Sequence, residues 1–324
     1  MSNRIKKIAK NREFSAVIGL VILCVLFSVL NHAFYSVTNI LNVLRSVSIL
    51  GMVAMGMTLV IICGGVDLSV GATYGMASMF AAYMMTHGIS IWISVLTGII
   101  AGFIVGTING NLVTRFDMPP LIATLGMMNI ARGLALIITG GLLISVTNMS
   151  VSDKTFDTFK FMGTGKIFGQ IPILVLFFVI TILITSVVLR RSIVGFRMKA
   201  IGGNIKAADA AGISSKSYII GSYAYAGVLA ALAGILNMAF LGTVQGTSGD
   251  GTQLNAIAAV VIGGTSIKGG AGSVFGTVIG VLIMGVLKNG LVLVGMSTYT
   301  QDVMVGVVII GSVALDYLKR RNQV

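Results

Sequence analysis

The sequence predicts an all-α protein that crosses a membrane many times. Apolar residues make up 56% of the 324 residues, glycine contributes 42 more, and only 10% are charged. A soluble domain carries about 25% charged residues, and no soluble core hides this much apolar surface. A membrane-spanning helix needs roughly 20 apolar residues, so this chain has enough for about ten spans. The composition argues against a soluble enzyme, a disordered chain and a nucleic-acid-binding domain.

Short polar segments divide the chain into ten apolar stretches, which are the predicted spans. The eighth stretch is short and broken by glycine, so we expect a re-entrant or discontinuous helix there. The stretches cover residues 14–31, 40–63, 68–86, 90–110, 119–140, 170–189, 217–241, 252–266, 273–294 and 300–318.

The distribution of Lys and Arg predicts which ends of the spans face the cytoplasm. If residue 1 is inside, 16 of the 22 basic residues fall on inside segments. The outside segments hold Lys154, Lys160 and Lys166, with Lys288 near an outer end. Cytoplasmic loops of membrane proteins are enriched in Lys and Arg. We therefore expect both termini in the cytoplasm and a multi-pass membrane protein, with the net charge of +13 explained by its cytoplasmic loops.

Two segments between the predicted spans are long. Residues 141–170 lie on the outer side and carry both acids and lysines, whereas residues 190–216 lie on the inner side and are strongly basic. Each is a candidate docking surface for a soluble partner on its own side. The whole chain, residues 1–324, is otherwise predicted to be a single transmembrane domain.

Glycine recurs at every fourth position in the fourth and ninth spans. Residues four apart share one helix face, and small residues there let two helices approach closely in lipid. Close packing is therefore the first interpretation, with a pore-lining or gating role as the alternative. The recurrence also indicates an inverted repeat of spans 2–5 and 7–10. The glycines are Gly98, Gly102, Gly106 and Gly110, and then Gly272, Gly276 and Gly280.

The known signatures of catalysis are absent from the sequence. The string nearest to a phosphate-binding loop, Gly163–Ile167, lacks its first glycine and its hydroxyl residue. There is no Gly-x-Ser-x-Gly or His-Glu-x-x-His motif, and Glu13 is the only glutamate. Cys24 and Cys63 both lie in apolar stretches, which argues against a disulfide or a zinc site. We predict no catalytic residue, no metal and no cofactor bound by this chain.

Polar residues within or beside the spans are candidates for a translocation pathway or gate. Arg132 is expensive to place at membrane depth, so it is expected to pair with a carbonyl or face a cavity. Asp67 either caps the third span or gates the pathway. Buried acids are scarce and neutral polar residues recur, which favours a neutral polar solute over an ion. The candidates are Asp67, Ser69, Asn109, Thr124, Arg132 and Thr265.

A short alanine-rich helix is predicted within the inner loop. Asn204 can cap a helix that runs through Ala207 and Ala208, and Gly212 can end it. Such a helix is too short and too weakly apolar to span a membrane, but it fits a groove on another protein. An ordinary ordered loop is the alternative interpretation.

This loop resembles the coupling helix of ABC importer permeases, whose pattern is Glu-Ala-Ala-x3-Gly. The chain has Lys206-Ala207-Ala208-x3-Gly212, with lysine in place of glutamate. Further strings are similar to the ribose/galactose-type sugar permeases, and the resemblance runs from about residue 36 to 318. These strings lie at residues 56–71, 119–128, 202–204, 254–266 and 289–293.

The resemblance implies a transmembrane permease subunit whose ATPase lies in separate subunits, which hold ATP and Mg. It further implies a second permease chain, identical or closely related, and an extracytoplasmic solute-binding protein. A stand-alone secondary carrier or channel and a non-transporting receptor or scaffold are the alternatives, and the transported sugar stays open. The residues that the resemblance assigns to ATPase coupling are Gly202, Gly203, Asn204, Ala207, Ala208 and Gly212.

Overall fold

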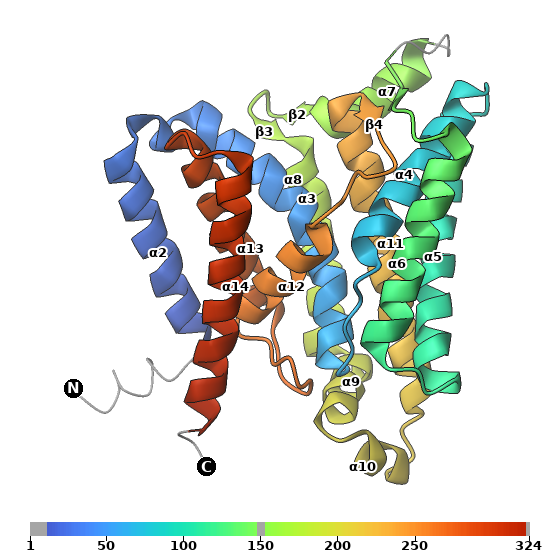
Figure 1. Cartoon of the computed structure of the whole chain (residues 1–324), viewed down its shortest axis with the longest axis vertical. Helices are drawn as coiled ribbons and strands as arrows, with labels where there is room; N and C mark the ends of the chain where they lie inside the picture. Colours follow the sequence, from blue (N-terminus) through green and yellow to red (C-terminus); the bar gives the residue numbers. More distant parts are fainter. Residues whose placement is uncertain (1–11, 148–152, 322–324) are drawn as a thin grey trace.

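The computed structural model describes residues 12–147 and 153–321 and is built almost entirely of helices, as predicted (Figure 1). Each of the ten predicted apolar stretches coincides with one helix. These are α2 (Arg12–Leu30), α3 (Val37–Ile62), α4 (Val70–Thr86), α5 (Ile91–Arg115), α6 (Pro120–Thr139), α8 (Ile173–Arg191), α11 (Ser215–Leu241), α12 (Thr252–Ile262), α13 (Val274–Leu293) and α14 (Thr298–Arg321).

Within the described residues, six helices are both long and apolar enough to cross a membrane, namely α3, α5, α6, α8, α11 and α13. The number of ten spans therefore stays a prediction.

The shorter elements connect the spans. They are the 3-10 helix η1 (His32–Tyr35), α7 (Asp153–Thr164), α9 (Ile193–Gly203), α10 (Ile205–Ala210), and the two-residue strands β1 (Ile144–Ser145), β2 (Lys166–Ile167), β3 (Ile171–Pro172) and β4 (Thr243–Val244).

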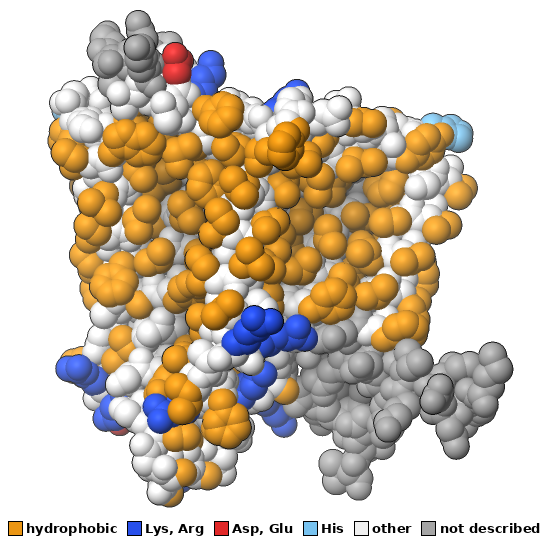
Figure 2. All heavy atoms as spheres, turned by 180° about the vertical axis from the view of Figure 1, so that it is seen from behind, with side chains coloured by type: hydrophobic (Ala, Val, Ile, Leu, Met, Phe, Trp, Pro, Cys, Tyr) orange, Lys and Arg blue, Asp and Glu red, His pale blue; other side chains and the backbone are white. Residues whose placement is uncertain are grey.

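The connecting elements gather at two opposite ends of the molecule. Helix α7 and the antiparallel strand pairs β1–β4 and β2–β3 lie at the upper end in Figure 1, while α9 and α10 lie at the lower end. The beginning of α2 and the end of α14 lie at the lower end as well. Seen from behind, a belt of apolar side chains separates the two ends, and Lys and Arg gather below it (Figure 2). This arrangement agrees with the predicted opposite sides of residues 141–170 and 190–216; four of the basic residues assigned to the inside lie in residues 1–11, outside the described part.

Helices α3 and α11 form the centre of the bundle. Every residue of α3 from Gly51 to Ile62 is buried, and α11 packs against α3, α4 and α5. An apolar helix that is covered on all sides belongs to the interior of a bundle. By contrast, α5 and α8 expose large apolar side chains such as Phe103 and Leu183. These outer faces form the belt that would meet lipid.

The glycine repeat of α5 lies where this helix packs closely against α4 and α11. A Cβ built at Gly110 would lie 2.6 Å from the Cα of Ile220 on α11, and one at Gly98 would lie 2.7 Å from the carbonyl oxygen of Ala77 on α4. A Cβ at Gly102 would overlap with the carbonyl oxygen of Gly227. Only glycine permits these approaches, which supports the packing interpretation of the repeat over a pore-lining role.

Helices α12 and α4 each follow a non-helical segment of the chain. Helix α12 has 11 residues, which is about 16 Å, or half of the roughly 30 Å of hydrocarbon. It lies at mid-height in Figure 1 and follows the non-helical residues 245–251. The predicted stretch 252–266 was longer, because Gly263 ends the helix. Helix α4 follows the non-helical residues 63–69, in agreement with the predicted break between the stretches 40–63 and 68–86.

Candidate functional site

The inner loop folds into the two short helices α9 and α10, each with its own cap. The Ser192 hydroxyl accepts a hydrogen bond from the Val194 amide at 3.2 Å and begins α9. The Asn204 side chain accepts from the Ala207 amide at 3.0 Å and begins α10, as predicted. Gly212 has a φ of +79°, a conformation that favours glycine, and follows the end of α10. The predicted short helix with a glycine stop is therefore present.

Helix α10 is exposed on all but one of its residues. Lys206, Ala207 and Ala210 are exposed, whereas Ala208 is buried against the main apolar core. The helix therefore has one side that anchors it to the bundle and one side that is free for a partner. Its exposed side combines Ala207 and Ala210 with Ile205, Lys206 and Asp209, so a partner would meet small, apolar and charged groups there. Of the residues predicted for coupling, Ala208 belongs to the anchoring side.

The end of α9 packs against two other turns of the chain in a cluster that we call the glycine junction, defined as Gly64, Gly202, Gly269 and Gly270. A Cβ at Gly202 would overlap with the carbonyl oxygen of Ile62 and lie 2.5 Å from the amide nitrogen of Gly270. The Gly270 amide donates a hydrogen bond to the same Ile62 carbonyl at 2.9 Å. The junction therefore joins α9 to the turn after α3 and to the turn between α12 and α13. Gly202, predicted as a coupling residue, is an internal contact of the chain.

Asp67, Ser69 and Asn109 form one buried cluster. One Asp67 carboxylate oxygen accepts from the Ser69 amide at 2.8 Å and from the Ser69 hydroxyl at 2.7 Å. The Asn109 amide on α5 donates to the Ser69 hydroxyl at 2.8 Å and to Asp67 at 3.4 Å. All three residues are at most 1% exposed. The cluster fastens the non-helical segment 63–69 to α5, so these predicted pathway residues meet each other rather than an open passage.

Arg132 on α6 forms an ion pair with Asp250, in the non-helical segment that precedes α12. The two side chains are 27% and 47% exposed, so the ion pair lies at the surface of the protein. The sequence predicted that Arg132 would pair with a carbonyl or face a cavity, and it did not identify Asp250 as its partner. The available signal was that an arginine at membrane depth needs a counter-charge of similar depth.

Thr124 and Thr265 do not join these clusters. The Thr124 hydroxyl is buried and donates to the Pro120 carbonyl of its own helix at 2.8 Å. Thr265 is buried beside Gly272, and its hydroxyl has no hydrogen-bond partner among the described residues. The first is therefore a local helix contact, and the second lies near the glycine junction.

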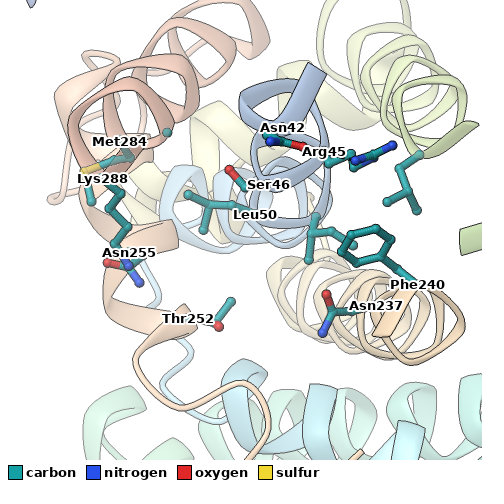
Figure 3. A pocket seen from close by; sticks show the side chains of 13 residues that line it. Asn42, Arg45, Ser46, Leu50, Asn237, Phe240, Thr252, Asn255, Met284 and Lys288 are labelled. Atoms are coloured by element: carbon teal, nitrogen blue, oxygen red, sulfur yellow. Dashed lines mark hydrogen bonds between the residues drawn. The ribbon is translucent and has the colours of Figure 1, made fainter. Parts of the chain in front are cut away.

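A cavity of about 440 Å³, lined by both apolar and polar side chains, lies between α3, α8, α11, α12 and α13 (Figure 3). Arg45 lines this cavity: its guanidinium lies 5.5 Å from the centre of the Phe240 ring and donates to the Asn42 side chain at 3.1 Å. Lys288 lines the same cavity from α13. Among the described residues, no group of three or more His, Cys, Asp or Glu side chains is arranged to hold a metal ion.

These features define a class of protein: a helical membrane permease with broken helices at its centre and a capped, partner-accessible helix at one end. Comparison with known proteins gives the family. Residues 39–313 match the family described as "Branched-chain amino acid transport system / permease component", and the chain belongs to this family of ABC transporter permeases. The predicted permease class is thereby confirmed, and the chain is a multi-pass protein of the inner membrane rather than an enzyme.

Several curated relatives are similar over most of their length. A ribose import permease protein of Bacillus subtilis (strain 168) is 45% identical over 93% of this chain and 92% of the relative. A ribose import permease protein of Escherichia coli (strain K12) is 36% identical over 95% and 94%. An autoinducer 2 import system permease protein of Photorhabdus laumondii is 32% identical over 96% and 91%. A solved inward-facing ABC transporter of metal-chelate type covers 93% of this chain and 98% of its own at 17% identity, with a TM-score of 0.49.

Proposed function

We propose that this chain forms the membrane pathway of an ABC importer for ribose or a closely related sugar. The observation that carries the proposal is the capped helix α10, exposed on one side and continuous with α9, whose end packs into the glycine junction. The ribose import permeases that match at 36–45% identity over more than 90% of the chain support the sugar class.

Helix α10 is the proposed site of attachment for a separate ATP-binding subunit. That subunit holds ATP and Mg, and its closure on ATP pulls or pushes α10. Because Asn204 is both the end of α9 and the cap of α10, the two short helices are joined without a flexible linker. A displacement of α10 therefore reaches Gly202, and through it the turns at Ile62 and Gly270.

The glycine junction passes this displacement to the broken helices. One of its turns continues into the non-helical segment before α4, and the other lies between α12 and α13. Arg132 and Asp250 tie α6 to the segment that precedes α12. Coupling of this kind requires contacts that differ between the inward-open and outward-open states. The glycine junction and the Arg132–Asp250 pair are the proposed contacts that change.

The remaining partners follow from the same proposal. Two permease chains, identical or closely related, enclose the pathway within membrane lipid. A solute-binding protein docks on the outer end, where α7 and the strand pairs β1–β4 and β2–β3 lie. Specificity for the sugar then resides mainly in the binding protein.

The test is ATP-driven sugar uptake by the reconstituted importer. Ala208 is buried, so Ala208→Arg would damage the fold, whereas Ala207 is exposed and reports on docking. We expect Ala207→Arg and Gly212→Pro to reduce ATP-driven uptake at least tenfold while the protein still inserts. Ala33→Arg, the same change at an exposed site on the opposite end, is the matched control and should transport normally.

Two results would contradict the proposal. Normal sugar uptake by both inner-loop variants would show that α10 is not the site of coupling to the ATP-binding subunit. Sugar flux through vesicles that contain this chain without ATP and without partner proteins would instead indicate a stand-alone carrier or channel.

A further inference from the structure

Helix α8 presents one continuous apolar face to the outside of the bundle. Its opposite face, which includes Phe178, Thr181 and Thr185, is buried. A helix of 19 residues is about 28 Å long and matches roughly 30 Å of hydrocarbon, so the exposed face would lie against lipid. The exposed apolar residues recur every three or four positions and therefore share one side of the helix. They are Leu176, Val179, Ile180, Leu183, Ile184 and Val187.

Two arginines end this lipid-facing side at the predicted inner end of the molecule. Arg190 and Arg191 continue the spacing of Leu183 and Val187, and both of their side chains are exposed. They belong to the last turn of α8, which reaches the depth of the lipid headgroups if the apolar face crosses the hydrocarbon. Neither arginine has a hydrogen bond or an ion pair with a described residue. The described chain therefore leaves both charges available to a ligand.

Helix α9 adds exposed apolar groups directly after the two arginines. Ile193 and Phe196 are 63% and 71% exposed and lie three positions apart, whereas Gly195 and Met198 are buried against the bundle. Exposed apolar side chains in adjacent turns beside basic residues are typical of segments that lie in the membrane interface. The end of α8 and the beginning of α9 therefore combine the two kinds of group that a lipid headgroup region attracts.

The charge around this helix end has one sign. No Asp or Glu occurs in the sequence between Asp157 and Asp209, and Lys and Arg gather below the apolar belt in Figure 2. Arg197 is already engaged, because its guanidinium donates to the Tyr218 hydroxyl and lies 5.7 Å from the centre of that ring. A guanidinium binds phosphate oxygens through parallel N–H donors. Basic clusters directly beside the cytoplasmic end of a span attract anionic lipids.

We propose that the inner end of α8 binds anionic phospholipid, with Arg190 and Arg191 on headgroup phosphates and with Ile193 and Phe196 in the interfacial layer beside them. A lipid fits this surface better than the ATP-binding subunit does, because the arginines continue the lipid-facing side of α8. A bound lipid would hold the end of α8 directly before Ser192, the cap from which α9 begins. The binding itself does not depend on the transport function proposed above.

The test measures which lipids the purified full-length chain retains from nanodiscs that contain equal amounts of phosphatidylglycerol and phosphatidylcholine. Native mass spectrometry reads the lipids retained per chain. Arg190→Gln/Arg191→Gln removes both charges from the end of α8. Lys160→Gln/Lys166→Gln removes two exposed charges from the opposite end of the molecule and is the matched control.

We expect the wild-type chain to retain phosphatidylglycerol in at least twofold excess over phosphatidylcholine. The arginine double variant should lose at least half of this excess, because the two guanidinium groups that hold the phosphates are gone. The lysine double variant should match wild type. Since both arginines are exposed, we expect the Tm of the arginine variant in phosphatidylcholine nanodiscs to equal that of wild type.

Equal retention of the two lipids by wild type, or the same loss of excess in both double variants, overturns the proposal. So does an arginine variant that keeps the wild-type excess of phosphatidylglycerol but binds the ATP-binding subunit at least tenfold more weakly, since the arginines would then face that subunit. Should the double variant fail to fold, Arg190→Gln and Arg191→Gln are measured singly. Each is expected to lose part of the excess, and the full wild-type excess in both single variants would contradict the site.

Discussion

A single methyl group at Gly202 tests whether the glycine junction transmits motion from α9 to the membrane helices. Its Cβ would overlap with the Ile62 carbonyl oxygen and lie 2.5 Å from the Gly270 amide nitrogen. Both neighbours are backbone atoms, so the clash cannot be relieved by rotating a side chain. The adjacent Gly203 is the matched control, because no described atom lies within 4 Å of a Cβ placed there.

The cost of Gly202→Ala can be estimated from two contributions. Overpacking of a tight site costs about 1–3 kcal/mol. Displacing the turn endangers the 2.9 Å hydrogen bond from Gly270 to Ile62, which contributes about 0.5–1.5 kcal/mol. The sum is about 1.5–4.5 kcal/mol, which corresponds to a fall of roughly 3 °C or more in Tm. Gly203→Ala should leave the Tm unchanged or raise it slightly, because alanine favours helix.

The assay compares the two alanine variants in detergent and in proteoliposomes with the ATP-binding subunit and the solute-binding protein. For Gly202→Ala we expect a lower Tm and sugar uptake that falls further than ATP hydrolysis, since force from α10 is no longer passed on. Gly203→Ala should retain both activities. Equal Tm values and equal uptake per ATP for the two variants would refute the assigned close contact and its role in coupling.

Two further predictions concern the contacts that hold the broken helices. Arg132→Asp or Asp250→Arg alone should lower uptake several-fold, and the exchanged double variant should recover part of it. Because the pair is partly exposed, its coupling energy in a double-mutant cycle should be about 1 kcal/mol or less, and no recovery would argue against the pair. Asn109→Leu should destabilise the chain by about 1–3 kcal/mol, since Asp67 loses a buried donor. Asn111→Leu, which breaks only a bond to its own helix, is the control, and an equal Tm loss for both would contradict the cluster.

The positions of the helices follow from local properties of the sequence. Each apolar stretch was long enough to satisfy its own backbone as a helix, which a membrane interior requires. The cap at Asn204 and the helix stop at Gly212 could also be predicted, because side-chain capping and a left-handed backbone conformation depend on a few adjacent residues. The distribution of Lys and Arg between the two ends of the molecule could likewise be predicted from the order of the spans alone.

Only some of the contacts of the site could be predicted from the sequence. The resemblance selected Gly202 and Ala208 as coupling residues, but sequence spacing could not show that both face inward. The break before α4 was predicted between residues 63 and 68, but the sequence could not show that Asp67 and Ser69 within it are buried against Asn109 of α5. Asp250 was overlooked as the partner of Arg132, since the two lie 118 positions apart and meet only when α6 packs beside the segment before α12.

By itself the sequence determined that this chain is a polytopic helical membrane protein with a short, capped inner helix, because hydropathy, span length and capping act over neighbouring residues, and its resemblance to known permeases gave the class. Only the tertiary structure decided which polar groups meet: Asp67 with Asn109 and Arg132 with Asp250. The physical reason is that helices pack through close contacts between distant segments, and each glycine crossing fixes a register that no local pattern specifies.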